Sequence, residues 1–178
     1  MKRAAVVYYS FDESTRALAE AIASAIGGDL LGLVPVGDSA RTFYHHVENP
    51  EQIETSPEYN SSKEHVWGNE SVKMNGTPVL ESYDFDPSQY ELIVIGSPVW
   101  AFTYAPPLRT FLEQTEIKGV KIALFCTHEG MIGSTFEDLK KALKGNEIIQ
   151  EADFEEPASR LEEYVEIAKE WAEELLEQ

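Results

Sequence analysis

Residues 90–107 read YELIVIGSPVWAFTYAPP, and this stretch does more than any other to decide the fold. Its first half, Leu92–Gly96, is a short apolar run without alternation, which is typical of a strand buried on both faces of a parallel sheet. Its second half is rich in aromatic residues and ends in two prolines, which suit the first turn of a helix over Pro106–Gln114. The stretch therefore predicts a strand, an aromatic loop and a helix.

The same succession of strand and helix occurs on both sides of this stretch. The apolar patterns predict strands at Ala4–Tyr9, Leu30–Val34, Val120–Cys126 and Glu147–Phe154, and helices at Ser14–Ile26, Ser134–Leu143 and about Pro157–Leu176. Strands that alternate with helices in this way predict an α/β fold with a doubly wound, five-stranded parallel sheet and helices on both faces. We expect residues 1–178 to form a single domain, since a chain of this length can bury one full core.

The segment from about residue 35 to residue 90 breaks the alternation. It is polar, contains clusters of Pro, Asn, Ser and Gly, and is too long for a structureless loop in a compact domain. We expect a helix near Asp38–Val47 and then an ordered excursion between the second and third strands. Five apolar side chains are expected to hold this excursion against the body: Trp67, Val72, Met74, Val79 and Leu80.

The chain is strongly acidic, with 32 Asp and Glu against 14 Lys and Arg and a formal net charge of −18. Such a charge repels nucleic acid and anionic membranes and attracts basic partners, or it serves solubility alone. One cysteine, Cys126, permits no intrachain disulfide and fits a reducing cytoplasm, where we expect the protein. The sequence has no signal-peptide pattern and no apolar stretch long enough to span a bilayer.

Three loops follow predicted strands: SFDEST (10–15), SPVWAFTYAPP (97–107) and THEGMIGST (127–135). Ligands of open α/β sheets bind beyond the carboxyl ends of the strands, so we expect these loops to form the site. The hydroxyls of SFDEST and the free N–H groups of a helix start favour a phosphate. The same residues would also suit an ordinary capped helix, with Ser14 or Asp12 as the cap.

Other chemistries find little support in the sequence. His45 and His46 are adjacent and His65 stands alone, so no metal-ligand spacing appears and no metal is expected. Ser10 and Ser97 have no evident His–Asp partners, which argues against a hydrolase. The sequence contains neither GxGxxG nor GxxxxGK[ST], so it lacks the Rossmann and Walker signatures. We therefore name no catalytic residue.

The tracts YYSFDEST, YELIVIGSPVWAFTYAPPLRTFL and KIALFCTHEGMIGSTFEDLKKAL together resemble the flavodoxin family. The resemblance implies a flavodoxin-like fold with sheet order 2-1-3-4-5 and non-covalent binding of FMN. It also implies an electron-transfer protein. The acidic surface would steer such a protein to basic redox partner proteins, and we expect a monomer or weak dimer. Two alternatives stay open: an NAD(P)H-dependent quinone or flavin reductase of the same fold, and a binding module that has lost FMN.

The resemblance assigns a phosphate-binding role to the first loop. The family pattern is Ser-x-Thr-Gly-Asn-Thr; Ser10 and Thr15 match it, and Ser14 keeps a polar group. Asp12 replaces a hydroxyl, and Glu13 replaces a glycine that allows close approach to the phosphate or an unusual φ. We expect the side chains of Asp12 and Glu13 to turn outward to solvent, where screening weakens their repulsion of a phosphate.

The resemblance assigns the flavin ring to the other two loops. Trp100 is expected to stack on the ring, and Phe102 and Tyr104 are weaker candidates; all three could instead pack under the excursion. His128 could bond a flavin edge or shuttle a proton, or it could be an exposed loop histidine. The predicted cofactor-binding residues are Ser10, Asp12, Glu13, Ser14, Thr15, Ser97, Pro98, Val99, Trp100, Ala101, Thr127, His128, Glu129, Gly130 and Gly133.

Overall fold

A computed structural model describes residues 3–37, 64–67 and 70–178, and its main sheet has six strands in these ranges. Five are parallel and lie in the order β2-β1-β5-β7-β8: β1 (Ala4–Tyr8), β2 (Asp29–Gly32), β5 (Leu92–Trp100), β7 (Lys121–His128) and β8 (Glu147–Glu155). This is the predicted order 2-1-3-4-5. The sixth strand, β6 (Thr103–Tyr104), pairs antiparallel with the end of β5 and was not predicted.

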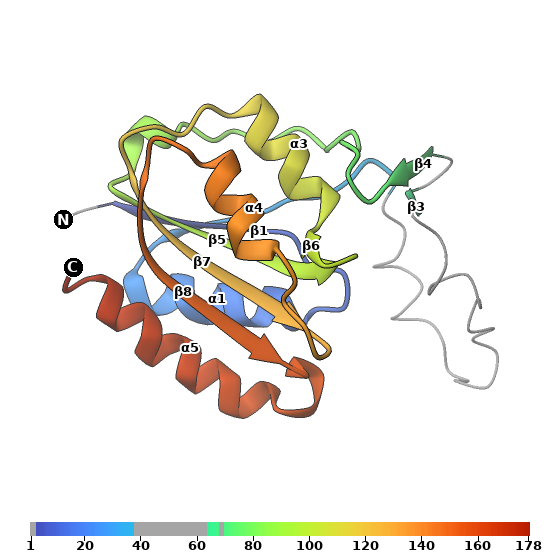
Figure 1. The fold of residues 1–178 in the computed structure, drawn as a ribbon. Coiled ribbons are helices and arrows are strands. Elements are labelled where there is room, and N and C mark those ends of the chain that lie inside the picture. The colour runs from blue at the N-terminus through green and yellow to red at the C-terminus, as the bar shows by residue number, and fades with distance from the viewer. Residues whose placement is uncertain (1–2, 38–63, 68–69) are drawn as a thin grey trace.

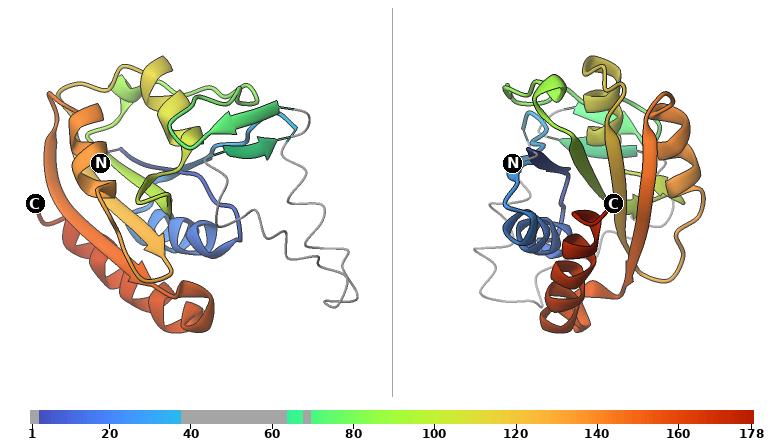
Figure 2. Two further views of the ribbon diagram at one scale, coloured as in Figure 1. Left: turned by 45° about the vertical axis from the view of Figure 1, so that its right-hand side comes forward. Right: turned by 90° about the vertical axis from the view of Figure 1, so that its left-hand side faces the viewer.

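Helices cover both faces of the sheet (Figure 1). Helices α1 (Ser14–Ile26) and α5 (Leu161–Leu175) pack on one face, and α3 (Pro106–Gln114) and α4 (Thr135–Ala142) pack on the other. The turned views in Figure 2 show the same two layers on either side of the strands. The doubly wound α/β class is therefore confirmed. None of the helices in the described part of the chain is long and apolar enough to cross a membrane.

Two apolar cores result, because successive strand residues point to opposite faces of the sheet. In β1, Val6 packs toward α1 and α5, whereas Val7 packs toward α3 and α4. In β5, a Cβ atom on Gly96 would lie 2.1 Å from Cζ of Phe125 on the neighbouring strand. The glycine of GSPVW is therefore required by packing within the sheet itself.

The first and last residues of the excursion between β2 and β5 lie side by side. Backbone hydrogen bonds join residues 34–36 to residues 79–81, and Pro35 and Leu80 form an isolated antiparallel bridge. Farther out, β3 (Glu64–Trp67) and β4 (Glu70–Lys73) form an antiparallel hairpin, here called the β3–β4 hairpin. This hairpin is a separate two-stranded sheet with no ladder to the main sheet among the residues described.

The expected anchors of the excursion are partly confirmed. Val72 is buried in the core, and Met74 and Leu80 pack against it. The expectation for Val79 was wrong: its side chain is 58% exposed, because it alternates with Leu80 on an extended segment and faces the other way. The expected helix at 38–47 and the side chain of Trp67 lie outside what the structure describes.

Candidate functional site at the carboxyl edge of the sheet

The loop between β1 and α1 is held by side chains that accept N–H groups from the first turn of α1. Ser10 is buried, and its Oγ accepts the N–H of Arg16 at 3.1 Å. Asp12 is exposed, and its Oδ1 accepts the N–H of Ser14 at 3.2 Å, but the capping position of α1 is Glu13, so neither Ser14 nor Asp12 is the cap. The Ser10 hydroxyl keeps its own proton and can still donate one hydrogen bond.

Glu13 adopts the backbone conformation of a glycine, with φ 73 in the left-handed region. A side chain there strains the backbone, since this conformation is one that glycine adopts without cost. The carboxylate lies on the surface and pairs with Nη1 of Arg16 at 2.8 Å. The charge of Glu13 is thus directed to solvent, as expected, and is partly compensated by a cation.

A buried hydrogen bond joins the first loop to the third. Oγ1 of Thr15, at the start of α1, lies 2.8 Å from Oγ1 of Thr127, near the end of β7. Both residues are almost completely buried, although they lie 112 positions apart in the sequence. The start of α1 and the end of β7 are therefore tied together at the edge where ligands of such sheets bind.

The second loop begins later than the sequence indicated. Ser97, Pro98, Val99 and Trp100 belong to β5 and not to a loop. The pairing of β5 with β1 ends at Gly96, whereas its pairing with β7 continues to Pro98. Beyond Gly96 the β1 side of β5 therefore has no strand to which a backbone N–H must donate, and Pro98, which lacks an N–H, is tolerated there. The fully buried Ser97 hydroxyl accepts the N–H of Ala105 at 2.9 Å and donates to the carbonyl of Pro98. Ser97 therefore holds the returning chain.

The turn between β5 and β6 is a tight two-residue hairpin turn. Its central residues, Ala101 and Phe102, have φ values of 48 and 66, as a type I′ turn requires, although Asn-Gly is the usual pair. The carbonyl of Phe102 accepts the N–H of Ser134 at 2.8 Å. A Cβ atom on Gly133 would lie 2.3 Å from that carbonyl oxygen, so Gly133 is the residue that lets the turn pack against α4.

Trp100 lies in a cluster of rings and is only 9% exposed. Its ring centroid is 5.6 Å from that of Tyr9, 5.5 Å from that of Phe11 and 4.9 Å from that of His65. His65 belongs to the β3–β4 hairpin, so Trp100 does pack under the excursion, as the alternative interpretation expected. The sequence offered no signal for His65, because its contact with Trp100 depends on how the excursion folds back.

The two weaker aromatic candidates differ from each other. Phe102 is 59% exposed, so it does not pack under the excursion. Tyr104 is 2% exposed, and the guanidinium of Arg109 lies 4.5 Å from its ring centroid. Burial raises the pKa of the Tyr104 hydroxyl, so it stays protonated at neutral pH. Tyr104 is a core residue, whereas Phe102 is presented to solvent beside the third loop.

His128 is the last residue of β7 and is buried, so the alternative of an exposed loop histidine was wrong. Its Nε2 lies 3.1 Å from Oδ2 of Asp153 on β8, and its Nδ1 accepts the N–H of Gly130 at 3.2 Å. Because Nδ1 accepts, the ring proton is assigned to Nε2, which donates to the carboxylate. Both ring nitrogens are thus engaged within the fold. Glu129 and Gly130 remain exposed at the edge.

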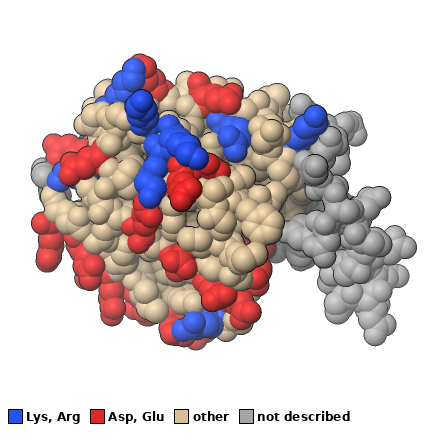
Figure 3. All heavy atoms as spheres, viewed as in Figure 1, with Lys and Arg blue, Asp and Glu red and all other residues tan. Residues whose placement is uncertain are grey.

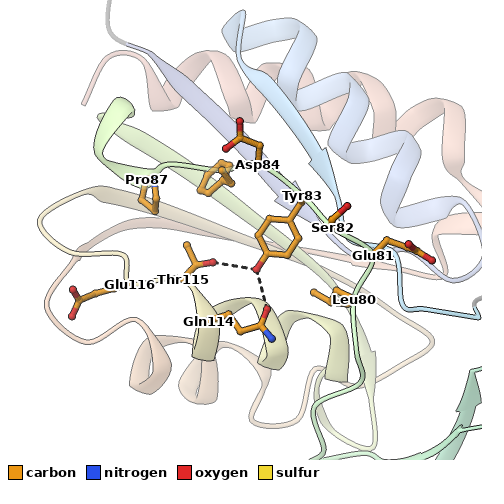
Figure 4. A pocket seen from close by; sticks show the side chains of 10 residues that line it. Leu80, Glu81, Ser82, Tyr83, Asp84, Pro87, Gln114, Thr115 and Glu116 are labelled. Atoms are coloured by element: carbon orange, nitrogen blue, oxygen red, sulfur yellow. Dashed lines mark hydrogen bonds between the residues drawn. The ribbon is translucent and has the colours of Figure 1, made fainter.

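Two hollows lie away from this edge. One of about 540 Å³ lies between residues 80–87 and the end of α3, where the Tyr83 hydroxyl is 3.4 Å from Oε1 of Gln114 (Figure 4). The other, about 460 Å³, lies where β1, β5, β7 and β8 begin. The first is unsuited to a phosphate, because its lining includes the carboxylates of Glu81, Asp84 and Glu116.

Other reactive groups are not arranged for chemistry. Cys126 is buried, and desolvation raises the pKa of its thiol well above the usual range, so the thiol is unreactive. Within residues 3–37, 64–67 and 70–178, no three His, Cys, Asp or Glu side chains are grouped to hold a metal ion. The features that stand out are therefore the hydroxyls at the carboxyl edge and the aromatic cluster beside them.

The sheet order and the three loops at its carboxyl edge define a flavodoxin-like α/β protein. Comparison with known families agrees: the chain belongs to the flavodoxin family, whose model matches residues 3–167. No curated protein matches it significantly in sequence.

Solved structures share the fold at low sequence identity. A putative flavoprotein from Bacteroides uniformis is 20% identical, with a TM-score of 0.66 over 96% of this chain and 97% of that chain. A flavoprotein from Lactobacillus acidophilus, solved in complex with FMN, is 23% identical, with a TM-score of 0.58 over 92% of this chain and 99% of that one. An azoreductase from Bacillus anthracis is 12% identical, with a TM-score of 0.53 over 98% of both chains.

Proposed function

We propose that this protein binds FMN non-covalently at the carboxyl edge of its sheet and transfers electrons. The observation that carries the proposal is the convergence of hydroxyls from the start of α1 and the end of β7, with Thr15 and Thr127 2.8 Å apart and Ser10 beside the same helix start. Hydroxyls and N–H groups at the start of a 13-residue helix suit a dianionic phosphate. Membership of the flavodoxin family and an FMN-containing relative of the same fold support the choice of FMN.

The residues at this edge fit such a group. Ser10 has a proton left to donate, and Glu13 directs its charge to solvent and pairs with Arg16. Trp100 supplies a flat aromatic ring beside the loop. Bound FMN would supply the redox chemistry; the chain's own residues would hold the phosphate, cover the ring and exclude water.

An electron carrier is favoured over a stand-alone enzyme. Both nitrogens of His128 are engaged and the Cys126 thiol is buried, so neither is placed to act on a substrate. The exposed lysines of α4 are paired, Lys140 with Glu151 and Lys141 with Asp138, and are not free to hold a nucleotide phosphate. A reductase is the second candidate, because a WrbA-like protein and an azoreductase share the fold.

The acidity of the chain suggests the class of partner. Residues 147–178 contain 12 Asp and Glu against two Lys and Arg, and α5 lies in this segment. On the face shown in Figure 3, blue side chains gather toward the top while red ones line the lower border. A basic redox protein would be steered to the acidic side of such a molecule.

Absorption spectroscopy tests the proposal. The protein titrated with FMN should develop a perturbed flavin spectrum, and riboflavin should bind more weakly because it lacks the phosphate. Equal affinity for FMN and riboflavin would remove the phosphate from the site, and no binding of either would leave a module that has lost its flavin. Rapid bleaching by NAD(P)H without a second protein would favour the reductase.

A further inference from the structure

His128 ties the start of the third loop to the end of β8. Its side chain is only 6% exposed, and both of its ring nitrogens are hydrogen-bonded. Nδ1 accepts the N–H of Gly130 at 3.2 Å, and Nε2 donates to Oδ2 of Asp153 at 3.1 Å. The carbonyl of His128 accepts the N–H of Glu156, just after β8, at 2.8 Å. One residue therefore fixes where the chain leaves two neighbouring strands.

The bond to Gly130 sets the path of the third loop. Gly130 has a φ of 136, which other residues rarely adopt, although a Cβ atom there would meet nothing within 4 Å. The glycine is therefore required by the backbone conformation that directs its N–H to the ring, and not by close packing. Among the residues that the structure describes, no protein group accepts the N–H groups of Glu129, Met131, Ile132 and Gly133.

The far end of the loop is also held. Gly133 packs on the carbonyl of Phe102, and the same carbonyl accepts the N–H of Ser134 at 2.8 Å and its hydroxyl at 3.2 Å. Residues 129–133 are thus anchored at both ends, while most of them are exposed and keep their donors available. A ligand that accepts hydrogen bonds there has less backbone to order, which favours its binding.

We propose that His128 is a positioning residue for the flavin ring. By accepting the N–H of Gly130, it holds residues 129–133 in the conformation in which their unused N–H groups bind the carbonyl oxygens of the ring. This inference rests on the proposed FMN binding. Only the tautomer with its proton on Nε2 has an acceptor at Nδ1, and Asp153 selects that tautomer by accepting the Nε2 proton.

The first test replaces one ring nitrogen at a time. Asparagine places its amide oxygen one bond beyond Cγ, as histidine places Nδ1, so His128→Asn keeps an acceptor for Gly130. Glutamine places its amide nearer to the position of Nε2, so His128→Gln keeps a donor for Asp153 and loses that acceptor. His128→Gln should bind FMN roughly threefold to tenfold more weakly than the unmodified chain, and His128→Asn should stay within about twofold of it. Affinities that are equal in the two variants, or lower for His128→Asn, would overturn the proposal.

Riboflavin shows which part of the cofactor the loop holds. It has the same ring as FMN and lacks the phosphate, so His128→Gln should weaken the binding of both ligands by the same factor. A loss for FMN alone would overturn the proposal, because it would place the effect at the phosphate.

Asp153 offers a second variant at an exposed position, which keeps the test open if His128 cannot be replaced without unfolding. Asp153→Ala removes the acceptor that keeps the ring proton on Nε2. The matched control is Glu155→Ala, which removes an exposed carboxylate from the same strand without taking a partner from the ring. Asp153→Ala should bind FMN more weakly than Glu155→Ala, and equal affinities would overturn the proposal.

Amide hydrogen exchange followed by NMR tests the same contact without flavin. The N–H of Gly130 should exchange faster in His128→Gln than in His128→Asn, because only the second variant keeps its acceptor. Equal exchange would overturn the role of His128, whatever the flavin does. Faster exchange in His128→Gln with no flavin bound by any variant would overturn the flavin as the ligand of the loop, and the proposed function with it.

Discussion

Single residues with unusual backbones gather at the carboxyl edge of the sheet. In the described part of the chain, four residues other than glycine have positive φ: Glu13, Ala101, Phe102 and Glu156. Glu13 lies in the loop between β1 and α1, the next two form the β5–β6 turn, and Glu156 follows β8, with its N–H bonded to the carbonyl of His128. Each costs on the order of 1 kcal/mol, and such strain tends to collect where a fold builds a binding site.

Glu13→Gly should stabilise the protein by releasing this strain. Glycine adopts the observed φ of 73 without cost, whereas alanine keeps the Cβ atom that causes the strain. Both Glu13→Gly and Glu13→Ala lose the ion pair with Arg16, so the glycine variant should be about 1 kcal/mol more stable than the alanine variant. This corresponds to roughly 2–4 °C in Tm for a chain of this size. Calorimetry of the two variants checks it. Equal Tm values would mean that the loop relaxes around the alanine.

The Thr15–Thr127 hydrogen bond should behave as a coupled pair. Thr15→Val leaves the buried Thr127 hydroxyl without its partner, which should lower the free energy of unfolding by about 1–3 kcal/mol. In the double variant Thr15→Val, Thr127→Val both sites are apolar, so the loss should be smaller than the sum of the single losses. Urea unfolding of the four proteins measures this coupling. Strictly additive losses would show that the two hydroxyls act independently.

At the scale of helices and strands, hydrophobic periodicity was enough for most of the fold. Helices α1 and α3 have the predicted bounds, because α1 has a clear apolar stripe and α3 begins with two prolines. Strand β6 could not be predicted, because Ala101–Phe102 lacks the Asn-Gly signal of a two-residue hairpin turn. Helix α5 begins at Leu161 and not at Pro157, since a short 3-10 turn precedes it.

The attachment of β6 to α4 should weaken in acid. Oδ2 of Asp138 accepts the hydroxyls of Ser134 and Thr103, and Oδ1 accepts from Nζ of Lys141. The bond from Ser134 first, and then those from Lys141 and Thr103, hold the pKa of the Asp138 carboxyl below its ordinary value of 3.8. A lowered pKa means that the stabilisation is present above the ordinary value and is lost as the pH falls through the folded-state pKa.

Asp138→Asn should therefore be less stable than the unmodified protein at pH 7, and the difference should shrink as the pH falls below the ordinary carboxyl pKa. Thermal unfolding followed at several pH values gives the comparison. Glu137→Gln, which removes an exposed carboxylate from the same turn of α4, is the control. A difference in Tm that does not change with pH would show that the carboxylate of Asp138 is not what holds β6.

At the scale of the whole molecule, the sequence predicted which loops meet but not what each side chain does there. The sheet order brings residues 10–15 and 127–135 together, and the rule for parallel sheets predicted that edge as the site. The burial of His128 against Asp153 and the packing of Trp100 against His65 depend on contacts between distant segments. Hydrophobic periodicity describes positions close together in the sequence, so it cannot predict contacts between distant segments.

The net charge of −18 should control how the reduced, FMN-loaded protein passes electrons to other molecules. Electron transfer to cytochrome c, used as a basic protein probe, should slow as salt rises, because the screening length falls from about 30 Å at 0.01 M to about 8 Å at 0.15 M. Ferricyanide, a small anion, should show the opposite trend, since salt weakens its repulsion. Stopped-flow rates across one salt series measure both. Rates that are flat for both acceptors would mean that the acidity serves solubility and does not steer partners.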